Sequence, residues 1–148
     1  MTDRFERFSY AISEIYHYWH IIAAEVLEAY GLKGSSAVYF TVLNRFPTGI
    51  TASKLGELCS RNKADVSRVI SQMMQKGFVY TDGRPYRTKL FLTAQGKEVA
   101  EHINERAEIA GDLGSAGLNE VQREAFYDAL ELIAANLKKI GNEGISNY

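Results

Sequence analysis

The segment that most constrains the fold runs from Arg61 to Met74, with the sequence RNKADVSRVISQMM. Its apolar residues recur at spacings of three and four, which predicts a helix with one buried side. Asn62 is suited to begin this helix, because its side-chain oxygen can accept a hydrogen bond from an unpaired backbone amide. The opposite side is small, hydroxylated or basic and is expected to face solvent. The predicted buried residues are Val66, Val69, Ile70, Met73 and Met74, and the predicted outward residues are Lys63, Ala64, Asp65, Ser67 and Arg68.

A shorter helix is predicted just before this segment, over residues 52–59. Thr51 is its expected N-cap, and Leu55 and Leu58 are expected to turn inward. A turn around Ser60 joins it to the longer helix. A short helix, a tight turn and a longer helix in this order form a helix-turn-helix.

A β-hairpin is predicted after the helix-turn-helix. Phe78–Tyr80 and Leu90–Leu92 are short runs of residues that favour strands. The segment between them, TDGRPYRTK, contains an Asp-Gly turn signal and a proline, so the chain should reverse there. The tip of this hairpin, or wing, is predicted to carry Arg84, Arg87 and Lys89.

A long first helix is predicted at the start of the chain. Apolar residues from Phe5 to Val26 alternate spacings of three and four, and Gly31 is a plausible stop. So wide an apolar face must be covered on two sides, by its own domain and by a second subunit. A second helix is predicted to begin at Ser35 or Ser36 and to break at Pro47.

Two more helices are predicted towards the end of the chain. Thr93 should begin one that reaches about Ala110, and the glycine-rich stretch 111–117 should break it. Asn119 is the expected N-cap of the last helix. The tail 141–148, GNEGISNY, is expected to be loose.

The charge is unevenly distributed, although the chain as a whole has a net charge of −1. Residues 61–89 contain seven basic and two acidic side chains, a balance of +5. Residues 90–148 contain five basic and ten acidic side chains, a balance of −5. Residues 1–60 contain five basic and six acidic side chains, a balance of −1. The positive field is therefore concentrated on one module, where it can meet phosphate groups.

The composition of the 61–74 helix predicts a DNA-reading surface. Small side chains allow close approach to a major groove, and arginine and serine reach base edges or phosphates there. Arg68 is expected to contact a guanine edge or a phosphate. Asp65 either accepts from a cytosine amine or serves as the capping partner of Asn62. The residues predicted to contact double-stranded DNA are Ser53, Lys54, Lys63, Ala64, Asp65, Ser67, Arg68, Arg84, Arg87 and Lys89.

Other classes of protein find little support. No apolar run approaches the roughly 20 residues of a membrane span, and the N-terminal residues lack the apolar core of a signal peptide. A single cysteine, Cys59, fits a reducing compartment, so a cytoplasmic location is predicted. Cys59 is a redox-sensor candidate only if it is exposed with a lowered pKa, and a buried small residue is the favoured interpretation.

Catalysis and metal binding are not predicted. Three histidines, one cysteine and scattered carboxylates form no nucleophile–base order, and no glycine-rich phosphate loop occurs. Glu14, His17 and His20 lie near one face of the first helix and resemble half of a metal site. An aromatic interface helix is the favoured interpretation, so no metal or cofactor is expected.

The order of these elements resembles the MarR family of winged-helix regulators. The stretch ITASKLGELCSRNKADVSRVISQMMQKGFV is similar to the family's paired helices, with Ser67-Arg68 at its usual hydroxyl–Arg position. LFLTAQGKEV, residues 90–99, is similar to the wing strand running into the next helix. The resemblance covers nearly the whole chain. One departure is that Arg84-Pro85-Tyr86 occupies the place where the family's wing usually carries Asp-Arg-Arg.

The resemblance implies a mostly α winged helix-turn-helix fold and a homodimeric transcriptional regulator, usually a repressor. Residues 1–32 and 94–148 would form the dimerisation region, and residues 33–93 would form the DNA-binding lobe, with its wing in a minor groove. A small phenolic or anionic effector would bind between these parts. The alternative is a dimeric ligand-binding or protein-interaction module that has lost DNA affinity. The candidate effector residues are Trp19, His20, Tyr39 and Arg45.

Overall fold

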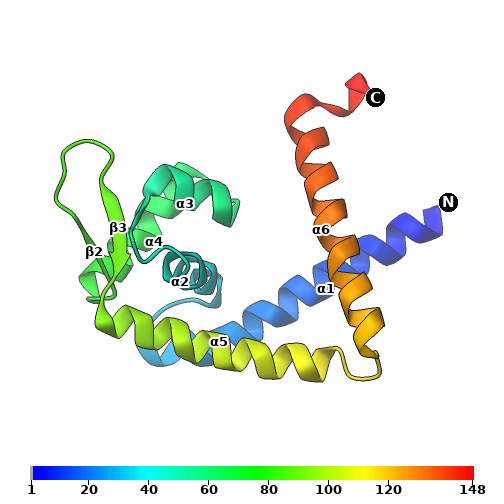
Figure 1. Ribbon diagram of the computed structural model, residues 1–148, viewed down its shortest axis with the longest axis horizontal. Coiled ribbons are helices and arrows are strands. Elements are labelled where there is room, and N and C mark those ends of the chain that lie inside the picture. Colours follow the sequence, from blue (N-terminus) through cyan, green and yellow to red (C-terminus); the bar gives the residue numbers. More distant parts are fainter. Residues whose placement is uncertain (1) are drawn as a thin grey trace. The chain divides into compact units, whose positions relative to one another are not determined.

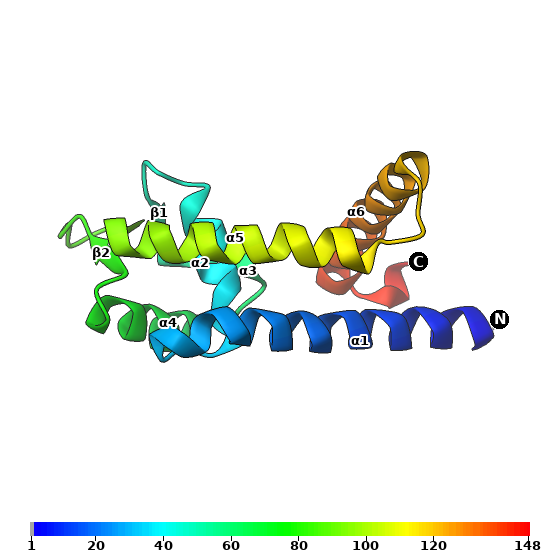
Figure 2. The same cartoon turned by 90° about the horizontal axis from the view of Figure 1, so that it is seen from below.

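The computed structural model describes residues 2–148 and is mostly helical (Figures 1 and 2). Short 3-10 turns occur at Glu28–Tyr30, Gly34–Ser36 and Ile145–Asn147. The predicted winged helix-turn-helix arrangement is confirmed. The helices are α1 (Thr2–Leu27), α2 (Ala37–Asn44), α3 (Ala52–Cys59), α4 (Lys63–Gln75), α5 (Ala94–Gly114) and α6 (Glu120–Glu143), and the strands are β1 (Ile50–Thr51), β2 (Val79–Thr81) and β3 (Lys89–Leu92).

The chain divides into two compact units. The first extends to Ala110, and the second comprises Gly111–Tyr148. In the first unit, the hairpin of β2 and β3 projects beside α3 and α4 (Figure 1), and α1 and α5 are two long, separate helices (Figure 2). The predicted division into a 33–93 lobe and an outer dimerisation region concerns subunit association and stays a prediction.

A three-stranded antiparallel sheet supports the wing, in the order β1-β3-β2. Ile50 and Thr81 both pair with Leu90, one from each side of the central strand. The hairpin was predicted, but β1 was not. It is only two residues long, and so short a strand carries no alternating pattern that a sequence could reveal.

One hydrophobic core unites the first unit. It takes residues from both flanking helices as well as from the helix-turn-helix and the sheet, so the lobe does not have a core of its own. Large side chains with almost no exposed surface fill its centre. These are Leu27 of α1, Tyr39, Phe40 and Leu43 of α2, Leu55 of α3, Met73 of α4 and Val99 of α5.

Two predicted core residues are wrong. Leu58 is 43% exposed, because the buried arc of α3 consists of Leu55, Gly56 and Cys59. Met74 is 42% exposed, because it lies about 100° around α4 from Met73, beyond the buried stripe. The other four predicted residues of α4 are buried, which confirms its amphipathic pattern.

The terminal helices are longer than predicted. α5 continues through Gly111 to Gly114, since glycine weakens a helix interior by only about 1 kcal/mol and does not forbid it. Gly117, with a φ of 94°, marks the real break. α6 likewise extends to Glu143, so most of the tail predicted to be loose is ordered. Asn119 caps α6 as predicted.

Candidate nucleic-acid interface

Side-chain hydrogen bonds fix the first turns of α3 and α4. Thr51 accepts a bond from the Lys54 amide at 3.3 Å, and the Asn62 side chain accepts one from the Asp65 amide at 2.8 Å. Both predicted N-caps are thereby confirmed. Ser60 takes a left-handed conformation with a φ of 52°, which ends α3 and turns the chain directly into α4.

The outward face of α4 presents the expected residues to solvent. Lys63, Ala64, Ser67 and Arg68 are exposed, whereas the opposite face enters the core. A groove of about 560 Å³ lies between α3 and α4, and its lining includes three predicted DNA contacts, Ser53, Lys63 and Ser67. Lys54 lies on α3 and forms an ion pair with Glu57 at 3.2 Å.

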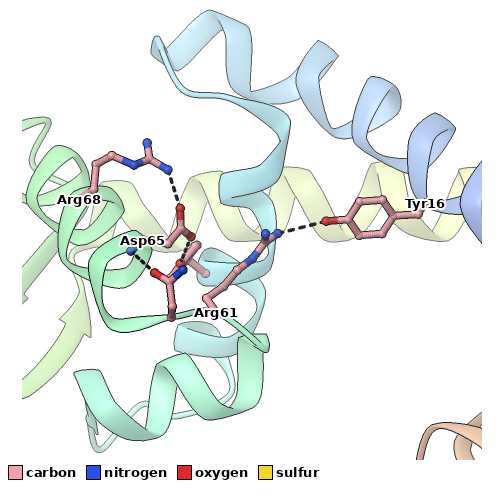
Figure 3. A network of polar contacts seen from close by, with 6 residues as sticks. Tyr16, Arg61, Asp65 and Arg68 are labelled. Carbon is pink, nitrogen blue, oxygen red and sulfur yellow. Dashed lines mark hydrogen bonds and ion pairs between the residues drawn. The ribbon is translucent and has the colours of Figure 1, made fainter. Parts of the chain in front are cut away.

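Asp65 joins the outward face of α4 to the core (Figure 3). The Tyr39 hydroxyl donates a hydrogen bond to Asp65 Oδ2 at 2.6 Å, and Arg68 Nη2 donates one to Oδ1 at 2.6 Å. These two donors, Tyr39 first, hold the pKa of Asp65 below its usual range. Burial and the bond to Asp65 raise the pKa of Tyr39, which therefore stays a donor.

These contacts bear on the two alternatives for Asp65 and correct the prediction for Tyr39. Asp65 contributes its backbone amide to the Asn62 cap, and its carboxylate pairs with Tyr39 and Arg68 rather than with Asn62. Tyr39 was an effector candidate, but its side chain is fully buried and directed at Asp65. The sequence did not reveal this contact, because the two residues are 26 positions apart.

The wing is a short loop organised by one carboxylate. Asp82 Oδ1 accepts hydrogen bonds from the amides of Arg84 and Lys89, both at 3.2 Å. The Arg84 guanidinium also lies 3.5 Å from Asp82 Oδ2. Arg87 lies over the Tyr86 ring at 5.5 Å. Arg84 and Arg87 are therefore on the exposed loop as predicted, whereas Lys89 is the first residue of β3 and not at the tip.

A cavity of about 260 Å³ lies where α1 approaches the helix-turn-helix. Trp19 and His20 line it, and so does Arg61, which was not among the residues predicted from the sequence. Arg45 is exposed at the C-terminal end of α2 and does not line this cavity, and neither does Tyr39. The structure thus brings together two of the four predicted effector residues.

Arg61 has an unusual environment in this cavity. Its Nε atom is buried and has no hydrogen-bond partner among residues 2–148. Its Nη2 atom donates a long hydrogen bond of 3.5 Å to the Tyr16 hydroxyl, as Figure 3 shows. Because Arg61 lines the cavity, the other donors of its guanidinium are suited to receive an anionic ligand there. The sequence feature that could have identified Arg61 is its position as a basic residue in the turn directly before the Asn62 cap.

Cys59 is buried, as predicted. Burial raises the pKa of its thiol to about 11, which opposes thiolate formation. Within residues 2–148, no group of three or more His, Cys, Asp or Glu side chains is placed to hold a metal ion. No helix in this described part of the chain is long and apolar enough to cross a bilayer.

Solved structures with this fold are numerous, although no protein-family model and no curated protein matches the chain. A MarR transcriptional regulator from Methanosarcina mazei Go1 is 25% identical, with 91% of this chain and 92% of that chain covered and a TM-score of 0.83. The transcriptional regulator SlyA is 21% identical over 89% and 94%, with a TM-score of 0.82. Staphylococcus aureus MepR in a complex with DNA is 20% identical over 88% and 96%, with a TM-score of 0.76.

These structural neighbours include members of the family that the sequence resembles. The matches span the flanking helices as well as the helix-turn-helix and the wing, since each covers about nine tenths of the chain. The Methanosarcina mazei and SlyA proteins are transcriptional regulators, and a MarR-family transcriptional regulator from Silicibacter pomeroyi also matches, with a TM-score of 0.76. The resemblance seen in the sequence is confirmed: the chain has the fold of the MarR-family transcriptional regulators.

Proposed function

We propose that the protein is a cytoplasmic, sequence-specific DNA-binding repressor that acts as a homodimer on a pseudo-palindromic operator. The observation that carries this proposal is the outward face of α4, where Lys63, Ser67 and Arg68 are exposed beside a groove. These side chains suit base edges and phosphates. The likeness to MepR supports it, because that protein was solved in a complex with DNA.

Exposed apolar side chains support the homodimer. On α1, Phe5, Ile12 and Ile15 are exposed along one seam. On α6, Val121 and Leu137 are also exposed. Apolar faces of this extent on helices are expected to be covered by a second copy of the chain. A two-fold dimer would place its recognition helices in successive major grooves, about 34 Å apart.

The cavity beside α1 supports regulation by a small phenolic or anionic effector. Trp19 and His20 offer flat surfaces to an aromatic ring, and the Arg61 guanidinium offers donors to a carboxylate or phenolate. A ligand there would contact α1 and the turn before α4 together. It would thereby change the population of dimers able to span both half-sites.

A second candidate function is a dimeric ligand-binding or interaction module without useful DNA affinity. The ion pairs of Arg68 with Asp65 and of Arg84 with Asp82 favour it, because each places a carboxylate beside a predicted DNA contact. This alternative predicts weak DNA binding with little dependence on salt. The repressor predicts that log K falls by about 0.9 per log unit of salt for each phosphate neutralised.

The deciding experiment is selection of binding sites from random duplex DNA by the purified protein. We expect an inverted repeat with half-sites about one helical turn apart. Arg68→Ala should weaken binding by roughly 1–3 kcal/mol. Arg106→Ala, which removes an exposed arginine of α5, should not. No enriched sequence, together with a flat salt dependence, would favour the interaction module.

A further inference from the structure

We propose that Asp65 is a positioning residue that holds Arg68 for contact with one guanine in each half-site. On this proposal Arg68 supplies the base contact, and Asp65 determines how selectively Arg68 makes it while adding nothing to affinity itself. The inference rests on the proposed function and goes beyond it, because it assigns a base and separates discrimination from binding strength. The buried Tyr39 would hold Asp65 in place through its hydrogen bond to the carboxylate.

The hydrogen bonds form a continuous path from the buried Tyr39 to the exposed Arg68, and Figure 3 shows its outer part, the Asp65–Arg68 bond. Tyr39 is fully buried on α2 and donates to one Asp65 oxygen, while Arg68 donates to the other. The Asp65 backbone is held as well, since its amide donates to the Asn62 cap. The side chain of Asp65 is 26% exposed and that of Arg68 is 51% exposed. Asp65 is thus fixed on three sides, and Arg68 extends from it into solvent.

The remaining donors of Arg68 match a guanine. A guanidinium has five N–H donors in a planar fork, and the Asp65 contact involves only the Nη2 group. Guanine presents O6 and N7 as paired acceptors in the major groove, which is the pattern that a fixed fork recognises. Both Asp65 oxygens already have donors, and Asp65 is less exposed than Arg68, so Arg68 is the side chain of the pair that extends towards a base.

The charge of Asp65 explains why its role is discrimination. A carboxylate on the face that meets DNA repels phosphates and lowers the affinity for every sequence equally. The same carboxylate raises specificity if it restricts the rotamers of Arg68. A freely rotating arginine can donate hydrogen bonds to phosphates or to other bases instead of to the guanine. Removing this charge should therefore strengthen nonspecific binding and weaken base discrimination.

The test uses the operator obtained by selection and a set of duplexes in which each base pair is changed in turn. Wild-type protein should prefer one guanine per half-site by about 5- to 150-fold, and Arg68→Ala should lose that preference. Asp65→Asn should reduce the preference several-fold while its affinity for random duplex rises. Tyr39→Phe retains the charge, so it should reduce the preference without that rise.

Two controls make the result specific. Glu98→Gln removes an equal charge from the exposed surface of α5 and should leave both quantities unchanged. Thermal melting of each variant checks that it is folded. Uniform weakening on all duplexes by Asp65→Asn, with the guanine preference intact, would mean a merely structural role and would overturn the inference. Tighter operator binding with the preference intact would mean that Asp65 only sequesters Arg68, which also overturns it.

The failure of the proposed function has a different signature. If the wild-type protein selects no sequence, the repressor proposal fails and the inference fails with it. If it selects an operator but no guanine depends on Arg68, the repressor proposal stands and only the role of the Asp65–Arg68 pair is overturned.

Discussion

The Tyr39 hydroxyl on α2 and the Asp65 carboxylate on α4 are joined by a 2.6 Å hydrogen bond across the first unit. One partner is fully buried and the other borders the solvent-facing side of α4. The bond therefore couples the packing of α2 to the position of the helix that is proposed to read DNA. Hydrogen bonds to charged groups contribute about 1.5–3 kcal/mol, more than neutral ones.

Tyr39→Phe should destabilise the protein by about 1–2 kcal/mol, because it removes this bond and leaves one Asp65 oxygen without its buried donor. Urea denaturation measures the change. Tyr80→Phe is the matched control, since Tyr80 is half exposed on β2, and a surface substitution should change stability by less than about 0.5 kcal/mol. Equal effects of the two substitutions would contradict the role given to the Tyr39 bond.

The same contacts predict a pH dependence of stability. The pKa of Asp65 is lowered in the folded protein, so its contribution is fully present above the usual carboxyl range and is lost as the pH falls through the folded pKa. Asp65→Asn cannot titrate. The difference in unfolding free energy between wild type and Asp65→Asn should therefore be larger at neutral pH than near pH 3. In a Tyr39→Phe background this pH-dependent difference should shrink, because Tyr39 is the largest cause of the shift.

The packing of α1 predicts opposite effects for two glycine substitutions. A Cβ at Gly34 would overlap the backbone carbonyl oxygen of His20 and press on the backbone of Ala24, so Gly34→Ala should cost about 1–3 kcal/mol. A Cβ at Gly111, inside α5, would meet no atom within 4 Å. Gly111→Ala should instead stabilise the protein by about 0.5–1 kcal/mol. Denaturant melts of both variants check the signs, and destabilisation of similar size by both would be inconsistent with this packing.

The features predicted correctly from the sequence are those marked by local chemistry. Thr51, Asn62 and Asn119 each have a side-chain oxygen that accepts from a backbone amide three residues later, so the starts of α3, α4 and α6 could be read directly. Helical spacing likewise identified the buried stripe of α4. The spacing did not fix the edges of such stripes, as Leu58 and Met74 show, because the neighbouring elements decide how wide a buried arc is.

The candidate site was less accessible to sequence reasoning, because its contacts join distant residues. Tyr39 and Asp65 are separated by 26 positions, and Tyr16 and Arg61 by 45. No periodic pattern relates such pairs. Tyr39 and Arg45 were selected for their chemistry alone, and the orientation of α2 directs one to Asp65 and leaves the other at the far end of the helix. Arg61 was missed for the same reason.

The final prediction concerns the cavity lined by Trp19 and Arg61. Trp19 is the only tryptophan in the chain, so its fluorescence reports on this cavity directly. Titration with benzoate should change the emission in a saturable way, because the ring can lie against Trp19 and the carboxylate can bond the Arg61 guanidinium. Benzyl alcohol has the same ring without the charge and should bind at least about 10-fold more weakly.

Arg61→Leu distinguishes this binding from nonspecific quenching. It retains much of the side-chain volume but removes every donor, so the affinity for benzoate should fall by about 10-fold or more, towards the affinity for benzyl alcohol. Arg106→Leu, a change on the exposed surface of α5, should leave the titration unaltered. If Arg61→Leu binds benzoate as the wild type does, the Arg61 guanidinium is not an anion receptor, and the proposal that this cavity is the effector site is wrong.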